Sequence, residues 1–219
     1  MSVHVLNFKP RPTLPALDSA VDLIGPIGVR LRFEAGEEIY AQEEEADLVY
    51  RVVSGAVRTM RLLSDGRRQI GDFYYPGDLF GLETGSQHRF SAEALGDADI
   101  LVVKRSALRS YGDDGGQLER MIWTATAKEL ERTQEHLLLL GRKTACEKVA
   151  SFLLNIANRF EGEFKTLPMG RQDMADYLGL TIETVSRMLT QLQSSHLIEI
   201  AHSRTLKIKN RRGLVDLSE

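Results

Sequence analysis

Hydrophobic residues in the first half of the chain occur in short runs that glycine and proline interrupt. Between residues 31 and 105 these runs include "EIYA", "DLVYRVVSG", "AVRTMRLL" and "DILVVK". Asp65-Gly66 separates two of them, which is a strong hairpin signal, and Pro76-Gly77 marks another turn. Because many short strands joined by turns are typical of closed or two-layered β structure, the pattern predicts a β-roll over residues 28–113. Its turns or bulges are expected at Gly36, Gly55, Gly71 and Gly81.

The hydrophobic spacing becomes helical from about Gln117. The run "LERMIWTATAKELERTQEHLLLL" contains neither proline nor glycine, and residues 114–141 are predicted to form one long helix. Alternating intervals of three and four residues, the period of a coiled coil, select one seam along it. The seam comprises Trp123, Thr126, Leu130, Thr133, Leu137 and Leu140. Either a partner helix or the chain's own β-roll could cover this seam, and its residues alone favour neither.

Helices and short strands alternate in the last part of the chain. Gly141-Arg142 predicts a break, followed by a helix to about Phe160. The β-like piece "EGEFKTLP" precedes two helices, "RQDMADYL" and "IETVSRMLTQLQSSH", which the turn "GLT" joins. Two strands follow in "LIEIAHSRTLKIKN", joined at residues 202–204. This order predicts a winged helix-turn-helix over residues 142–219, and residues 1–27 are a lead-in.

The second helix of this motif has one apolar face and one polar face. Its buried stripe is Val185, Met188, Leu189 and Leu192, and Thr181 is the expected N-cap. The start of such a helix enters the major groove of DNA. The candidates for reading bases are Ile182, Glu183, Ser186 and Arg187. The candidates for binding phosphates are Thr184, Arg171 on the preceding helix and Arg204 on the wing.

Each candidate has a chemical reason. Arg187 can donate two hydrogen bonds to guanine O6 and N7, while Glu183 can accept one from cytosine N4 and orient the guanidinium. Ser186 can meet a thymine methyl or a base edge, and Ile182 can contact thymine or extend the buried stripe. The simpler interpretation of Glu183 and Arg187 is a surface ion pair at i, i+4. The surrounding cap, turn, stripe and wing favour base reading.

Composition narrows the classes of function. The net charge is −3, yet residues 142–219 hold 12 Lys/Arg against 9 Asp/Glu, a modest excess that suits a polyanionic partner. A single cysteine, Cys146, excludes cysteine-built metal sites. Cys146 is either a packing residue or a redox switch activated by Lys143 and Lys148. With no bilayer-length apolar run and no secretory signal, we expect a cytoplasmic protein without a membrane partner.

Three stretches carry a resemblance to a known family: "PGDLFGLE", "LLLLGRKTACEKVASFLL" and "GRQDMADYLGLTIETVSRML". In this order, over nearly the whole chain, they resemble the cyclic AMP receptor protein/fumarate-nitrate reductase (CRP/FNR) regulators of bacterial transcription. The resemblance implies an α+β fold: a jelly-roll β-roll like cyclic-nucleotide-binding domains, a long dimerisation helix and a winged helix-turn-helix. It also implies a homodimer on palindromic double-stranded DNA, and an activator that contacts RNA polymerase.

The recognition helix and the β-roll indicate the branch. "ETVSR" resembles the fumarate-nitrate reductase branch, which implies that Glu183, Ser186 and Arg187 read a TTGA-type half-site, while Ile182 replaces an arginine of the cyclic AMP branch. In the β-roll, Leu82 stands where that branch has its ribose-binding glutamate. The cysteine cluster of oxygen-sensing members is absent.

The chain therefore resembles the FixK-type regulators. This implies effector-independent control of microaerobic and nitrogen-fixation genes, without cofactor or metal.

Two other functions remain as alternatives, a CRP-like regulator gated by a small molecule and a cupin-like enzyme. The first shares the fold and differs only in the β-roll pocket. The second needs clustered histidine and carboxylate ligands, whereas His88 is the only histidine between residues 31 and 105. The sequence favours a DNA-binding regulator that is not an enzyme.

Overall fold

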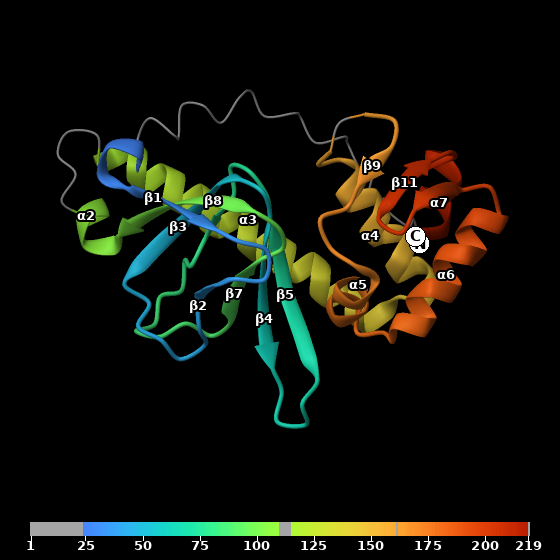
Figure 1. Cartoon of the computed structure of the whole chain (residues 1–219), viewed down its shortest axis with the longest axis horizontal. Coiled ribbons are helices and arrows are strands. Elements are labelled where there is room, and N and C mark those ends of the chain that lie inside the picture. The colour runs from blue at the N-terminus through green and yellow to red at the C-terminus, as the bar shows by residue number, and fades with distance from the viewer. Residues whose placement is uncertain (1–23, 110–114, 161, 219) are drawn as a thin grey trace, which may run out of the picture.

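The computed structural model describes residues 24–109, 115–160 and 162–218. Figure 1 shows a β-strand lobe and a mainly helical lobe, with α3 (Gly115–Arg142) running from one to the other. The order of β-roll, long helix and winged helix-turn-helix confirms the predicted fold. None of the helices in the described ranges combines the length and apolarity needed to cross a bilayer.

The β-roll consists of two antiparallel four-stranded sheets. Its strands are β1 (Val29–Phe33), β2 (Glu38–Tyr40), β3 (Leu48–Ser54), β4 (Val57–Leu62), β5 (Arg68–Tyr74), β6 (Leu79–Phe80), β7 (Ser91–Ala94) and β8 (Ala98–Lys104). One sheet has the order β1-β8-β3-β6 and the other β2-β7-β4-β5. The short elements η1 (Gly25–Ile27) and α2 (Arg105–Arg109) flank them. Gly71 is the extra residue of a bulge, because Thr59 pairs with Asp72 and Met60 with Ile70.

Aromatic side chains fill the space between the two sheets. Tyr40, Tyr50, Tyr74 and Phe80 are all buried in one cluster. The rings of Tyr50 and Phe80 stack with centroids 5.1 Å apart, and those of Tyr74 and Phe80 lie 5.2 Å apart. Since such side chains bury a large area each, this cluster is the main packing unit of the roll.

The long helix does not end where the sequence predicted. α3 continues through Gly141 to Arg142, and α4 (Ala145–Ala157) begins after two linking residues. The break is fixed by a capping box, in which Thr144 accepts a hydrogen bond from the Glu147 N–H and the Glu147 carboxylate accepts one from the Thr144 N–H. The predicted break at Gly141-Arg142 was therefore wrong by about two residues, because a cap determines it and the glycine does not.

The C-terminal lobe is a winged helix-turn-helix followed by an additional helix. Its elements are β9 (Lys165–Thr166), α5 (Arg171–Leu178), α6 (Ile182–Ser194), β10 (Ile198–His202), β11 (Thr205–Ile208) and α7 (Arg211–Ser218). Gly179 ends α5 with a φ of 62°, a left-handed conformation that glycine adopts without strain and that turns the chain into α6. The sequence pattern did not predict α7, whose Leu214 is fully buried.

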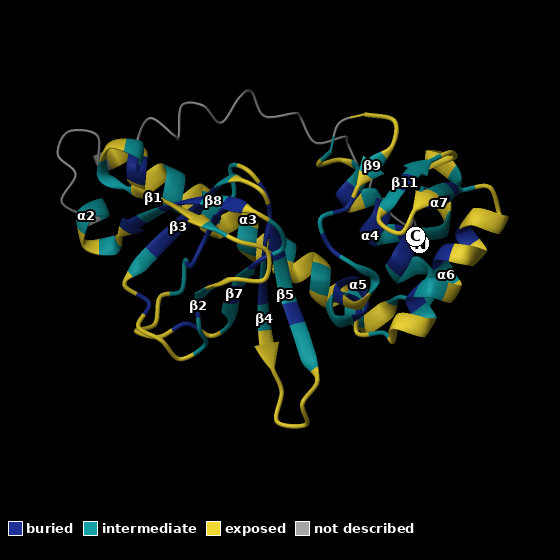
Figure 2. Ribbon diagram, in the orientation of Figure 1, coloured by how far each residue is buried: buried dark blue, intermediate teal, exposed yellow. Residues whose placement is uncertain are grey.

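The two lobes share one apolar core. Ile70, Phe73 and Tyr75 of the β-roll belong to the same cluster as the buried faces of α4, α5 and α6. The Phe73 ring lies 5.3 Å from that of Tyr177 on α5. Figure 2 shows buried positions in both lobes, whereas the tip of the β4–β5 hairpin and much of α6 are exposed. The helical lobe is thus packed against the β-roll as well as joined to it.

Candidate nucleic-acid interface

The start of α6 is held by its predicted cap. The Thr181 hydroxyl accepts a hydrogen bond from the Thr184 N–H at 3.2 Å, and the two hydroxyls are 3.1 Å apart. This confirms Thr181 as the N-cap and turns Thr184 toward the helix end.

The two faces of α6 are separated as the sequence predicted. Val185, Leu189 and Leu192 are buried and Met188 is half-buried. The opposite face is exposed, and it includes Ile182, Glu183, Arg187, Thr190 and Gln191. One face therefore belongs to the core, and the other presents donors and acceptors to solvent.

Glu183 and Arg187 do not form the surface ion pair that the sequence allowed. Among the described residues, Arg187 forms no ion pair with Glu183 and does not contribute to the shift in the Glu183 pKa. Instead, a hydrogen bond from its own backbone N–H and one from the Thr181 hydroxyl lower the pKa of Glu183. The carboxylate thus serves the helix N-terminus, where negative charge is favoured, and Arg187 remains exposed.

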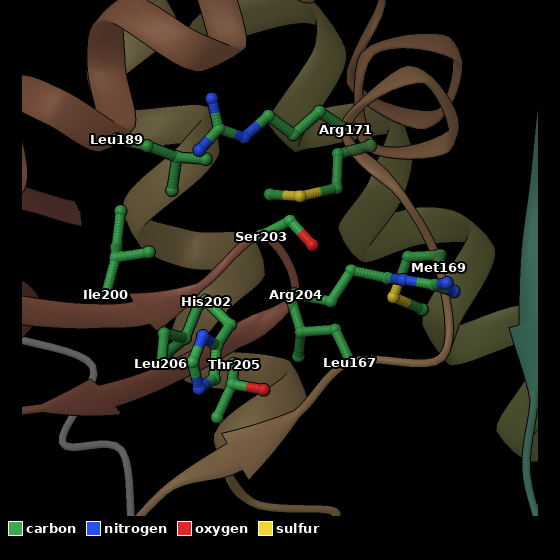
Figure 3. Close-up of a pocket in the computed structure, with 11 residues that line it drawn as sticks. Leu167, Met169, Arg171, Leu189, Ile200, His202, Ser203, Arg204, Thr205 and Leu206 are labelled. Carbon is green, nitrogen blue, oxygen red and sulfur yellow. The ribbon is translucent and has the colours of Figure 1, made fainter.

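Ser186, Arg171 and Arg204 make contacts within the domain. Arg171 Nη1 on α5 donates to Ser186 Oγ at 3.2 Å, and Arg204 Nη1 on the wing donates to the Pro168 carbonyl at 3.1 Å. Figure 3 shows both arginines beside a small pocket between α5, α6 and the wing. Its volume of about 10 Å³ would hold at most one water, so it is a packing gap and not a ligand site.

Most of the predicted seam on α3 is exposed. Trp123 is 76% exposed, Leu130 58% and Leu137 70%, so their own β-roll does not cover them. Thr126 and Thr133 are also exposed, and each hydroxyl donates to the carbonyl four residues earlier.

The last seam position and one further leucine differ from the pattern. Leu140 is only half-buried, because it lies against the turn at Gly179. Leu138, which the seam pattern did not select, is 64% exposed.

The surroundings of Cys146 bear on its two alternative roles. It is half-buried, and burial, with a smaller effect from Glu147, raises the pKa of its thiol. Lys143 Nζ donates to Ser151 Oγ at 2.9 Å and to the Ser218 carbonyl, while Lys148 Nζ donates to the Leu178 carbonyl at 3.2 Å. The raised thiol pKa favours the packing alternative for Cys146 over the redox switch.

In the β-roll stretch that departs from the cyclic AMP pattern, the polar side chains bond one another and the nearby backbone. His88 is buried and stacks on Tyr40 with ring centroids 3.7 Å apart, and its Nδ1 lies 3.2 Å from Glu83 Oε1. Arg105 donates to the carbonyls of Glu83 and Gly81. Glu83 therefore points to a neighbouring histidine.

Some contacts were not predictable from local patterns. His136 on α3 stacks on Tyr177 of α5 with centroids 4.0 Å apart, and its Nε2 donates to the Tyr177 carbonyl at 2.7 Å. Burial, opposed by this hydrogen bond, lowers the pKa of His136. These residues are 41 positions apart, so no short motif indicates their pairing.

The comparisons with known proteins agree with this architecture. Residues 30–113 match the model of the cyclic nucleotide-binding domain, and residues 147–217 match the Crp-like helix-turn-helix domain. Together with the fold, they define a two-domain transcription regulator of the CRP/FNR class.

Individual relatives narrow the class. The nitrogen fixation regulation protein FixK of Azorhizobium caulinodans is 46% identical over 88% of this chain and 80% of that protein, and its namesake in Rhizobium meliloti is 43% identical over 90% and 93%. The structure of FixK2 from Bradyrhizobium japonicum has a TM-score of 0.84 and 47% identity, covering 88% of this chain and 98% of that one. The chain belongs to the CRP/FNR family, and its relatives include these FixK regulators.

Proposed function

We propose that the chain is a homodimeric, sequence-specific transcription activator that binds a TTGA-type palindrome without an effector. The observation that carries the proposal is the polar face of α6, capped at Thr181, exposed to solvent and free of a Glu183–Arg187 ion pair. The relatives named above are regulators, which supports a DNA-binding role over an enzymatic one.

Arg187 is the proposed reader of the guanine in TTGA. Its guanidinium is exposed and can form the bidentate contact to O6 and N7. Glu183, Ser186 and Ile182 complete the base-reading set, with Arg171 orienting the Ser186 hydroxyl. Thr184, Arg171 and Arg204 are the proposed phosphate contacts, which set register without reading sequence.

Dimerisation is proposed to occur through the seam on α3. Three large apolar side chains lie one heptad apart on an exposed face, namely Trp123, Leu130 and Leu137. Covering such a stripe with a second copy would remove this apolar surface from water. A twofold pair of recognition helices then requires inverted half-sites about one helical turn apart.

Effector independence is proposed from the interior of the β-roll. The core between the two sheets is filled by the side chains of Tyr40, Tyr50, Tyr74 and Phe80. The Glu83 carboxylate lies within hydrogen-bond distance of His88. Arg89 is exposed. A regulator gated by a nucleotide would need these side chains to be displaced.

The activating role is proposed from relatives. The transcriptional activatory protein AadR of Rhodopseudomonas palustris is 42% identical over 78% of this chain. We further propose that the chain acts in the cytoplasm with RNA polymerase as a partner. The names of the two nitrogen fixation regulators above support a role in the control of microaerobic and nitrogen-fixation genes.

The deciding experiment is fluorescence anisotropy of the purified protein with a duplex carrying TTGA and its inverted repeat. A scrambled duplex of the same composition is the control, at physiological salt and with no effector. We expect the palindrome to bind at least about 10³-fold more tightly. Equal binding to both duplexes would overturn the proposed specificity. Tight binding only after a cyclic nucleotide is added would overturn effector independence and favour the gated alternative.

A further inference from the structure

Two arginines of the β-roll grip the first helix of the helix-turn-helix. Arg58 on β4 donates to Asp173 Oδ1 on α5 at 2.5 Å and to Glu93 Oε1 on β7 at 2.6 Å. Arg68 on β5 donates to Asp173 Oδ1 and to Asp176 Oδ2, both at 2.7 Å. We call Arg58, Arg68, Asp173 and Asp176 the interdomain clamp.

The clamp is shielded from water. The side chains of Asp173 and Asp176 are 11% and 12% exposed, and those of Arg58 and Arg68 are 13% and 24% exposed. At the exposed tip of the same hairpin, Arg67 pairs with Asp65 but is 79% exposed. Removing a partner from a buried ion pair leaves an uncompensated charge, whereas an exposed pair contributes little. Loss of the Arg68 side chain should therefore leave buried carboxylates without a partner, whereas loss of the neighbouring Arg67 side chain should change little.

The orientation of α5 determines that of α6. The three-residue connection from Gly179 to Thr181 is closed by a left-handed glycine and an N-cap, so it has little freedom. Arg171 on α5 also bonds Ser186 on α6. Contacts that fix the orientation of α5 therefore also fix the orientation of the exposed α6 face that is proposed to read DNA.

We infer that the clamp residues are positioning residues for DNA binding: they hold the recognition helix in its DNA-competent orientation by contacts within the chain, where a gated regulator would need a ligand. This inference rests on the proposed function for its DNA partner. The apparent affinity of a protein falls in proportion to the fraction that is binding-competent, so loss of the clamp lowers affinity without touching a base or phosphate contact.

The test measures DNA affinity and domain orientation on the full chain. Arg68→Met and Asp176→Asn remove clamp charges, Arg67→Met is the matched control, and Arg68→Lys retains the charge. Orientation is read by pulsed electron paramagnetic resonance in a Cys146→Ser background, with spin labels at Lys104→Cys and Gln193→Cys, two exposed positions on the two lobes. The labelled chain is diluted with unlabelled chain so that distances within one protomer dominate.

We expect Arg68→Met and Asp176→Asn each to weaken binding to the palindrome by about tenfold or more and to broaden the distance distribution of the DNA-free protein. Arg67→Met should match the unsubstituted protein in both readouts, and Arg68→Lys should recover part of the affinity. Wild-type affinity and a narrow distribution in both clamp variants would overturn the inference. So would an affinity loss at unchanged distances, or broadened distances at unchanged affinity.

Thermal unfolding of each variant separates a lost orientation from a lost fold. Should Arg68→Met unfold, Asp176→Asn, which keeps the size of its side chain, decides the outcome. The distance measurement needs no DNA, so the clamp is tested even if the unsubstituted protein fails to bind the palindrome and the proposed function falls.

Discussion

α3 and α6 both carry apolar side chains at helical spacing, but they use them in opposite ways. α6 buries Val185, Leu189 and Leu192 and exposes its polar face. α3 leaves Trp123 and Leu130 in solvent. Hydrophobic periodicity thus tells which residues share a face, and only the three-dimensional contacts tell whether the same chain covers it.

Leu189→Ala should have the largest effect. It deletes a side chain that is only 4% exposed, and we expect a loss of about 2–5 kcal/mol in the free energy of unfolding. Denaturant unfolding measures it, with the exposed Thr190→Ala as control. A loss below that of Thr190→Ala would contradict the burial of this face.

Leu130→Glu tests the opposite behaviour on α3. In the proposed dimer it would place two like charges across the seam, and we expect dimerisation to weaken by about 2 kcal/mol or more. Sedimentation over a concentration series measures this. Lys128→Glu introduces the same side chain at another exposed position of the helix, and it should leave the dimer intact. An unchanged dimer in Leu130→Glu would place the interface elsewhere.

Arg187→Ala tests the exposed polar face of α6. It should cost about 1–3 kcal/mol of discrimination at the guanine contact and leave folding unchanged. Anisotropy with single-base variants of the palindrome measures the discrimination. If base preference at that position is retained, Arg187 is not its reader.

Arg204→Ala should produce a smaller and less selective change. A lost phosphate contact weakens all duplexes alike and makes the salt dependence shallower by about one unit of slope. Affinities over a salt series measure it. A loss confined to the palindrome would argue for base reading by the wing.

His136, which flanks the seam on α3, gives the smallest expected effect. Burial lowers the pKa of His136, so the unfolded chain binds a proton at higher pH than the folded one. The stability from neutral His136 is fully present above about pH 6.5 and decreases as pH falls below it. Thermal unfolding from about pH 7.5 to about pH 5.5 should show a weaker pH dependence in His136→Gln. Identical profiles would rule out His136 as the titrating group.

Local signals in the sequence were sufficient for much of the fold. Asp65-Gly66, Gly179 and Thr181 act within a few residues, so the hairpin, the turn and the cap could be predicted from their spacing. The separation of faces on α6 follows in the same way.

Features that depend on distant residues could not be predicted. Gly213 lies within α7, and a glycine in a sequence argues against a helix. In the structure, its lack of a side chain lets Leu197 approach. The Arg68–Asp176 pair joins residues 108 positions apart. The local pattern likewise does not reveal that Lys143 bonds Ser151 and that Lys148 bonds the Leu178 carbonyl.

The link between α3 and α4 is only two residues long, Lys143 and Thr144, and extended chain spans at most about 3.6 Å per residue. In the proposed dimer, with so short a link and a clamped α5, the separation of the two recognition helices would be governed by how the two α3 helices pair. Under the proposed function, different parts of the chain would then determine the bases of the operator and the distance between its half-sites. Substitutions on the exposed face of α6 would change the bases of an operator, whereas substitutions along α3 would change its spacing.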